Sequence, residues 1–483
     1  MTPTNTNGLP KWVRYRAAAY LRGKGLSLGV PSLIDGPLFP ILAHEGTAFE
    51  LKVDPAPHSH VVGDDLSIFA DGKFNHVVTT PSHPKLNEVA AKLMVGGHLI
   101  LISPEDKDLQ VKGPWRIKEM VEQDGLHVVV LKRLAGSTNI LEAVTPTTGR
   151  KRACVARYGA IGDALQLTPM IHQLADDGYE VTLNVSPYTT EVYRNNPYVH
   201  NIVVQERNVI PNPDLGEYWD YWRKEYDLYI NLSESIEGKL LKVEGRSDFY
   251  TPAEWRRKVC DVNYHDQHMK LAGVEGSQYH LPELYFSNSE HKDMRWEWKV
   301  LADKFVVMWS LKGSSFHKLY PFYPELIKSW LSKHPDSYVL QMGGPESQQY
   351  QITHDRAIPL AGQWPIRKSM LATQYAQLVV GVESAIINAA SCYDTPKICL
   401  LSHSTANNLT KYWKNVQVLE PNTDIAPCYP CHQLHYKLES CPLVDVDIEG
   451  RAINNLPRCT TAIEPERIYD AMETVYRQWR ASR

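Results

Sequence analysis

The stretch RYGAIGDALQLTP, Arg157 to Pro169, decides the fold because it joins a strand pattern to a helix pattern through two glycines. The apolar residues ACVA precede it, and the apolar residues that follow recur at the three- and four-residue spacing of a helix. A strand that turns into a helix in this way predicts the first unit of a parallel α/β sheet. Asp163 stands on the turn, at the edge where such sheets bind ligands.

The carboxylate of Asp163 has two interpretations. Gly159 and Gly162 let the backbone turn tightly, so the acid reaches a cleft without obstruction by side chains. A carboxylate held there can act as a general base. The same acid could instead cap the helix that follows. The local residues leave both interpretations open.

The pattern extends outward into three blocks. Residues 1–134 alternate strand-like and helix-like segments, and 135–152 is rich in Ser, Thr, Gly and Pro, which predicts a linker. The next two blocks are 153–300 and 301–483. Alternating strands and helices resume from 153, become less regular over 207–300, and begin again in the block 301–483. The sequence therefore predicts an α/β protein with two Rossmann-like domains that face a cleft, plus an additional Rossmann-like domain at the N-terminus.

The composition excludes several classes of protein. The chain has 483 residues, of which 43% are hydrophobic and 22% charged, as in globular proteins. The net charge of −4 gives no global attraction to nucleic acid or to an anionic membrane. No apolar run is long enough to span a bilayer, and the first residues lack the apolar core of a signal peptide. We expect a cytoplasmic protein with at most peripheral membrane contact.

Five motifs, in order, resemble those of glycosyltransferase family nine, the ADP-heptose:lipopolysaccharide heptosyltransferases. They are RYGAIGDALQLTP, NNPYVHNIV, KGSSFHKLYP, MGGPES and LVVGVESAIINAA, followed by C-terminal cysteines. The likeness covers about residues 153–480. It implies a GT-B fold and an inverting transfer of sugar from a nucleoside diphosphate, generally without a catalytic metal. It also implies that Asp163 is the general base.

The same resemblance places the donor site in the C-terminal half. In KGSSFHKLYP, Gly313, Ser314 and Ser315 leave backbone and hydroxyl donors available to a diphosphate. Lys318 supplies a compact positive charge for the departing β-phosphate. An ordinary surface loop with a solvated lysine is the alternative interpretation.

Two further turns are expected at the donor site. Gly344 permits close approach of a ligand, and Glu346 could accept hydrogen bonds from a ribose, although a plain strand-to-helix turn explains both. Glu383, Ser384 and Ala385 stand where relatives usually carry Asp-Ser-Gly or Asp-Thr-Gly. The helix that follows can still bind phosphate or sugar hydroxyls at its N-terminus. The departure indicates either a changed sugar or a loss of activity.

Four cysteines cluster near the C-terminus, at Cys428, Cys431, Cys441 and Cys459. The spacing C-x2-C-x9-C-x17-C suits a structural zinc site, because thiolates on a tight turn can share one metal. Unmetallated thiols and disulfides are the alternatives, and a reducing cytoplasm disfavours disulfides.

The N-terminal block is similar to a class I methyltransferase domain in the order of its segments. An intact cofactor loop would carry Gly-x-Gly after the first strand, but here Val30 and Pro31 follow Gly29. Asp54 could still hold a ribose. We interpret the block as a degenerate domain used for packing or for recognition of the acceptor.

Three functions follow from these observations. The first is an inverting hexosyl-, heptosyl- or pentosyltransferase that uses a nucleoside-diphosphate sugar. The second is a methyltransferase that uses S-adenosylmethionine, alone or beside the first activity. The third is a binding protein for glycans or nucleotides that has lost catalysis. The acceptor is open: a glycan, a protein or a modified nucleic-acid base would each offer a hydroxyl group.

Overall fold

A computed structural model of the chain forms two compact units. The first draws on residues 1–156, 182–187 and 201–231, and the second on 157–181, 188–200 and 232–483. The structure describes residues 10–20, 25–27, 49–50, 74–79, 86–103, 111, 113–135, 140–142, 149–205, 210, 212–437, 440–441, 444–446 and 452–483.

The first unit contains a seven-stranded sheet of order β2-β1-β3-β4-β6-β5-β7. Strands β1 to β4 pair in parallel, and the hairpin of β5 and β6 adds antiparallel pairing. Asp124 and Gly125 both adopt positive φ, which a two-residue hairpin turn requires. The strands are β1 (Gly25–Ser27), β2 (Phe49–Glu50), β3 (Phe74–Thr79), β4 (Leu93–Ser103), β5 (Pro114–Gln123), β6 (Leu126–Arg133) and β7 (Ile140–Glu142).

The expected linker of residues 135–152 differs from the prediction in one detail. Strand β7 lies inside the expected linker and pairs in parallel with β5. Its three residues gain their strand conformation from the neighbouring strand, which local composition does not reveal. Gly29 and Asp54, on which the cofactor question depends, lie outside the described residues.

Helices α1 (Lys11–Ala18) and α7 (Leu215–Arg223) share an aromatic core in the first unit, where Tyr15 meets Tyr218 edge-on. Arg16 is buried in this core and forms ion pairs with Glu119 and Glu225. The N-terminal helix is thereby fixed to both β5 and the segment after α7.

A four-stranded sheet has the order β10-β9-β8-β11, and β11 pairs with β8 in parallel. Its strands are β8 (Arg152–Arg157), β9 (Glu180–Val185), β10 (Val199–Val204) and β11 (Leu228–Asn231). Strand β8 is the apolar segment that the sequence predicts before the glycine turn.

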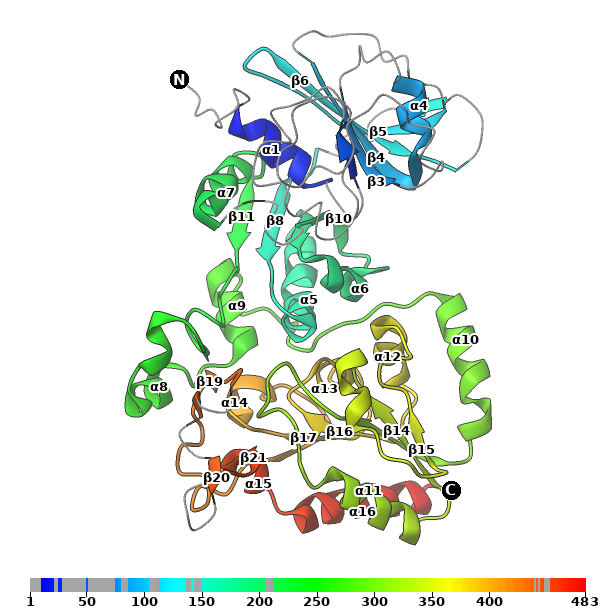
Figure 1. The fold of residues 1–483 in the computed structure, drawn as a ribbon, viewed down its shortest axis with the longest axis vertical. Helices are drawn as coiled ribbons and strands as arrows, with labels where there is room; N and C mark the ends of the chain where they lie inside the picture. Colours follow the sequence, from blue (N-terminus) through cyan, green and yellow to red (C-terminus); the bar gives the residue numbers. More distant parts are fainter. Residues whose placement is uncertain are drawn as a thin grey trace. The chain divides into compact units, whose positions relative to one another are not determined.

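The second unit is built on a six-stranded sheet of order β15-β14-β13-β16-β17-β18, in which every pair is parallel. This is the doubly wound order of a Rossmann fold, so the predicted α/β class is confirmed. Helices α11 and α16 cover one face, and α12 and α13 lie on the other (Figure 1). The elements are β13 (Phe305–Ser310), α11 (Tyr323–Lys333), β14 (Ser337–Met342), β15 (Ala357–Pro359), α12 (Ile366–Ala372), β16 (Leu378–Val382), α13 (Ala385–Ala390), β17 (Lys397–Leu400), β18 (Val416–Leu419) and α16 (Pro465–Ala481).

Helix α5 (Ile161–Asp176) belongs to the second unit and packs against α9 (Tyr264–Ala272) and α13. Among the described residues, no helix has the length and apolar character needed to cross a bilayer. The remaining elements are α4 (Leu86–Ala91), α6 (Thr190–Tyr193), α8 (Ala253–Val259), α10 (Asn288–Trp298), α14 (Ala406–Leu409), α15 (Arg458–Thr461), β12 (Lys242–Val243), β19 (Gln433–Leu434), β20 (Val444–Val446) and β21 (Ala452–Pro457).

Candidate functional site

The second unit contains a cavity of about 770 Å³, within the range of small-molecule sites. One wall is the start of α5, and the opposite walls are the turns that follow β13, β14 and β16. The carboxyl ends of parallel strands therefore line the cavity, as expected for a ligand site in a doubly wound sheet.

Asp163 lines this cavity from the first turn of α5. Its Oδ2 accepts a hydrogen bond from the backbone N–H of Ala160 at 2.7 Å, and its Oδ1 lies 3.1 Å from Arg157. The side chain keeps 20% of its surface exposed. The two interpretations of Asp163 are thus compatible, because the carboxylate caps the helix and still faces the cavity.

Arg157 is the buried support of this carboxylate. Its guanidinium contacts both oxygens of Glu237, at 2.9 and 3.0 Å, in addition to Asp163. Burial alone would lower the pKa of Arg157, but the two acids raise it above its usual value. A bidentate pair of this kind fixes orientation, so Glu237 and Arg157 hold Asp163 in place.

Gly159 lies beneath the site and does not line the cavity. A Cβ at this position would stand 2.7 Å from the Asp163 side chain and 2.8 Å from the Arg157 guanidinium. Only glycine lets these two side chains meet above the backbone. Gly162 does line the cavity, next to Asn388 of α13.

Lys318 lies across the cavity on the turn after β13. The turn is closed by a hydrogen bond from Gly313 N–H to Lys318 carbonyl at 2.8 Å, and a Cβ on Gly313 would collide with the Lys318 side chain. Burial lowers the pKa of Lys318, whereas Glu383 and Asp163 oppose that effect. Within the described residues the ammonium has no hydrogen-bond or ion-pair partner, so it is available to an anion.

The turn after β14 forms the wall that carries Gly343, Gly344 and Glu346. A Cβ on Gly344 would collide with the carboxylate of Glu346, which is exposed at the cavity. Trp364 lines the same region, and the Lys368 ammonium lies 4.3 Å from the centroid of its ring.

Glu383 lies at the end of β16 and lines the cavity, but its carboxylate is directed to a neighbouring loop. It accepts hydrogen bonds from the hydroxyls of Ser402 (2.6 Å) and Ser404 (2.7 Å) and from Nδ1 of His403 (3.1 Å). Burial alone would raise the pKa of Glu383, but His403, Lys318 and Ser402 hold it well below its usual value.

Ser384 and Ala385 also line the cavity, at the start of α13. The Ser384 hydroxyl caps this helix and contacts the Ser310 hydroxyl at 2.8 Å. Asn388 donates to the Ser384 carbonyl, and its buried side-chain oxygen has no hydrogen-bond partner.

The cavity thus brings together most of the residues predicted from the sequence. Asp163, Gly162, Gly313, Ser314, Lys318, Gly344, Glu346, Glu383, Ser384 and Ala385 all line it. Ser315 does not, because its hydroxyl is buried and lies 3.3 Å from His317. Sequence reasoning missed several lining residues. Asn388 lies within a recognised motif, and five others lie outside the motifs: Tyr188, Glu237, Tyr264, Trp364 and His403.

The four C-terminal cysteines lie outside this cavity. Cys431 and Cys459 are buried, and Cys428, Cys431 and Cys459 carry no disulfide. Burial raises the pKa of Cys431 to about 12, and the thiols of Cys428 and Cys441 raise it further. Four thiols are a suitable donor set for zinc. In the described part of the chain, however, no three metal-ligating side chains converge on one point, so the zinc site stays a prediction.

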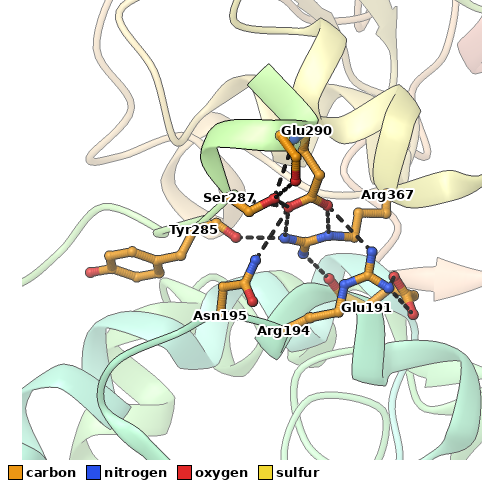
Figure 2. Close-up of polar contacts among 8 residues, drawn as sticks. Glu191, Arg194, Asn195, Tyr285, Ser287, Glu290 and Arg367 are labelled. Atoms are coloured by element: carbon orange, nitrogen blue, oxygen red, sulfur yellow. Dashed lines mark hydrogen bonds and ion pairs between the residues drawn. The ribbon is translucent and has the colours of Figure 1, made fainter. Parts of the chain in front are cut away.

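A second polar network supports the cavity wall formed by α12. Figure 2 shows the Arg367 guanidinium between the carboxylate of Glu290 and the backbone carbonyls of Glu191 and Tyr285. Arg367 is 5% exposed at its side chain, and the carbonyl contacts measure 2.7 and 2.6 Å. The network joins α12 to α6 and to the start of α10.

We predict that this network makes the free energy of unfolding decrease at low pH. Hydrogen bonds from Arg367 and Ser287 lower the pKa of Glu290 to about 2 from its ordinary 4.5. The ionised Glu290 therefore stabilises the protein fully when the pH is above the pKa of this residue in the unfolded chain. The stabilisation is lost as the pH falls toward 2. Urea denaturation from pH 6 to pH 2.5 should show a weaker loss of stability for Glu290→Gln than for the wild type. If the free energy of unfolding fell equally with pH in the two proteins, the role of Glu290 in the pH dependence would be contradicted.

Comparisons with known proteins gave structural matches only. No family model and no curated protein sequence matches the chain. A family 9 glycosyltransferase from Veillonella parvula has 13% identity and a TM-score of 0.48, covering 67% of this chain and 97% of its own. ADP-heptose lipopolysaccharide heptosyltransferase II from E. coli has 13% identity and a TM-score of 0.45, covering 68% and 99%. The iron-containing dodecameric glycosyltransferase TibC from enterotoxigenic E. coli has 13% identity and a TM-score of 0.47, covering 75% and 84%.

Proposed function

We propose that the protein is an inverting glycosyltransferase of GT-B type that moves a sugar from a nucleoside diphosphate to an acceptor hydroxyl. One observation carries the proposal: Asp163 lines the same cavity, at the ends of parallel strands, as Lys318, whose ammonium has no partner among the residues that the structure describes. A base and a cation that share a cavity suit a reaction in which a hydroxyl attacks and a diphosphate leaves.

In the proposed reaction, the acceptor oxygen forms a bond to the anomeric carbon of the donor. Asp163 takes the hydroxyl proton as the nucleophile approaches. The bond between the anomeric carbon and the diphosphate oxygen breaks, and its electron pair stays on the diphosphate. Lys318 stabilises the negative charge that develops there. Because attack and departure occur on opposite faces, the anomeric configuration inverts.

The contacts of the site support these roles. Glu237 and Arg157 fix the Asp163 carboxylate, so the base needs little reorganisation before reaction. Gly313 lets the Lys318 side chain pack against the backbone of the turn, because a Cβ on Gly313 would lie 2.7 Å from Lys318 Cδ, and both residues line the cavity. We assign the nucleoside to the wall that carries Glu346 and Trp364, where a carboxylate can bind ribose hydroxyls and an indole can stack on a base.

We propose a packing role for the N-terminal domain. Arg16 of α1 forms ion pairs with Glu119 of the sheet and with Glu225 after α7, and these pairs fix the helix in place. The alternative of methyl transfer predicts that S-adenosylmethionine binds. A role in recognition of the acceptor remains the second proposal for this domain.

The proposal is tested by thermal unfolding in a panel of UDP-glucose, ADP-glucose, GDP-mannose, their nucleoside diphosphates and S-adenosylmethionine. A ligand that binds only the folded protein raises the free energy of unfolding by about 2.7 kcal/mol when its concentration is a hundred times Kd. The melting temperature rises as a result. We expect at least one nucleotide to raise it. No shift with any nucleotide, or a shift with S-adenosylmethionine alone, would contradict the proposal.

A further inference from the structure

We propose that His403 binds a hydroxyl group of the transferred sugar through Nε2, and that the buried Glu383 is its positioning residue. This inference rests on the proposed function and deepens it, because it assigns sugar recognition to a residue outside the predicted motifs. The sequence places Glu383 itself at the sugar, yet the structure directs its carboxylate to residues 402–404.

The hydrogen bonds of Glu383 exclude it as a direct sugar ligand. Both of its oxygens are occupied by protein donors: Oε1 accepts from Ser404 and from the backbone N–H of Ser402, and Oε2 accepts from the Ser402 hydroxyl and from His403. A ligand hydroxyl would have to displace one of these buried donors and leave it unpaired. The free energy lost with that unpaired donor exceeds the free energy gained from the new hydrogen bond.

The same carboxylate sets the tautomer of His403. An ionised carboxylate only accepts, so the ring nitrogen that faces Glu383, Nδ1, carries the proton. Burial lowers the pKa of His403, an effect that Lys318 reinforces and Glu383 opposes. The neutral ring then presents Nε2 as a hydrogen-bond acceptor. Among the described residues no protein donor reaches Nε2, although the ring lines the cavity.

An acceptor at this place matches a hydroxyl and not a phosphate, because phosphate oxygens are acceptors too. The position within the cavity favours the transferred sugar over the ribose. A Cβ on Gly313 would lie 2.7 Å from both the Glu383 carbonyl oxygen and Lys318 Cδ, so the residue that holds His403 lies beside the turn that carries Lys318. The ribose is assigned to the wall of Glu346. His317 packs edge-on against His403, with ring centroids 5.3 Å apart, and restricts the ring.

Nuclear magnetic resonance of histidine side chains tests the tautomer without a ligand. In the full chain with ¹⁵N-labelled histidine, the signals lost in His403→Phe should show a protonated Nδ1 and an unprotonated Nε2. In Glu383→Gln, which removes the ionised acceptor, we expect this tautomer preference to weaken. A protonated Nε2 in the wild type would overturn the inference.

Binding measurements test the ligand. We compare UDP-glucose with UDP, ADP-glucose with ADP and GDP-mannose with GDP, in the wild type, His403→Phe and Glu383→Gln. The expected result is about tenfold weaker binding of a sugar nucleotide to His403→Phe, with its nucleoside diphosphate unaffected. The matched control is His200→Phe, at an exposed histidine outside the cavity, which should change neither.

The outcomes separate the two proposals. Unchanged binding of a sugar nucleotide to His403→Phe would overturn the role of His403. Equal weakening of a sugar nucleotide and its diphosphate would place His403 on the nucleotide and overturn the sugar assignment. If wild-type protein binds none of the six compounds, the proposed function itself fails, and the inference fails with it. The melting temperature of each variant shows whether it is folded. If His403→Phe is not folded, Glu383→Gln, the milder change, serves in its place.

Discussion

Replacing Asp163 with Asn is expected to abolish sugar transfer while leaving donor binding intact. The amide preserves the shape of the side chain and can still accept a hydrogen bond, but it cannot take a proton from the acceptor. General bases contribute about 10²- to 10⁴-fold to rates, so kcat should fall by that factor. The measurement is release of nucleoside diphosphate from the sugar nucleotide that gives the largest thermal shift.

The control for this prediction is Asp177→Asn, at the far end of α5. Asp177 accepts a side-chain hydrogen bond from Gln173 and lies outside the cavity, so its turnover should match that of the wild type. Unchanged turnover in Asp163→Asn would remove Asp163 from the role of base. Loss of donor binding in the same variant would instead indicate that Asp163 organises the cavity wall.

Replacing Lys318 with Met is expected to weaken binding of the nucleoside diphosphate about 10- to 100-fold, the equivalent of ~1.5–3 kcal/mol for a hydrogen bond to a charged group. Methionine fills a similar volume, so the loss reports the ammonium group. The rate of transfer should fall as well, because the leaving diphosphate loses its cation. Calorimetric titration with UDP, ADP and GDP measures the first effect, and diphosphate release measures the second.

Lys328→Met provides the matched control, since Lys328 is exposed on α11 and outside the cavity. Loss of Lys318 also deprives Glu383 of a neighbouring positive charge, so thermal unfolding of the variant is measured in parallel. Wild-type affinity for all three diphosphates in a folded Lys318→Met protein would be incompatible with the proposed donor site.

The parallel sheets were predictable from the sequence, and so was the presence of Asp163 and Lys318 in one cavity. Asp163 follows β8 of the four-stranded sheet and Lys318 follows β13 of the six-stranded sheet, and parallel sheets bind ligands at the carboxyl ends of their strands. The helix period after Gly162 and the amphipathic pattern of α16 also matched the structure. Local sequence patterns suffice to predict the structure where strand, turn and helix follow one another directly.

Long-range side-chain contacts were not predictable. Glu237 reaches Arg157 across 80 residues, and Glu383 turns toward Ser402 and His403 on the loop after the next strand. Nothing near Glu383 in the sequence indicates those donors.

A crystal structure of the protein with a bound sugar nucleotide from the panel tests the central claim most directly. The account predicts a β-phosphate oxygen about 3 Å from Lys318 Nζ, with the anomeric carbon on the side of the cavity that carries Asp163. A diphosphate bound away from Lys318, or a sugar separated from Asp163 by protein atoms, would contradict it.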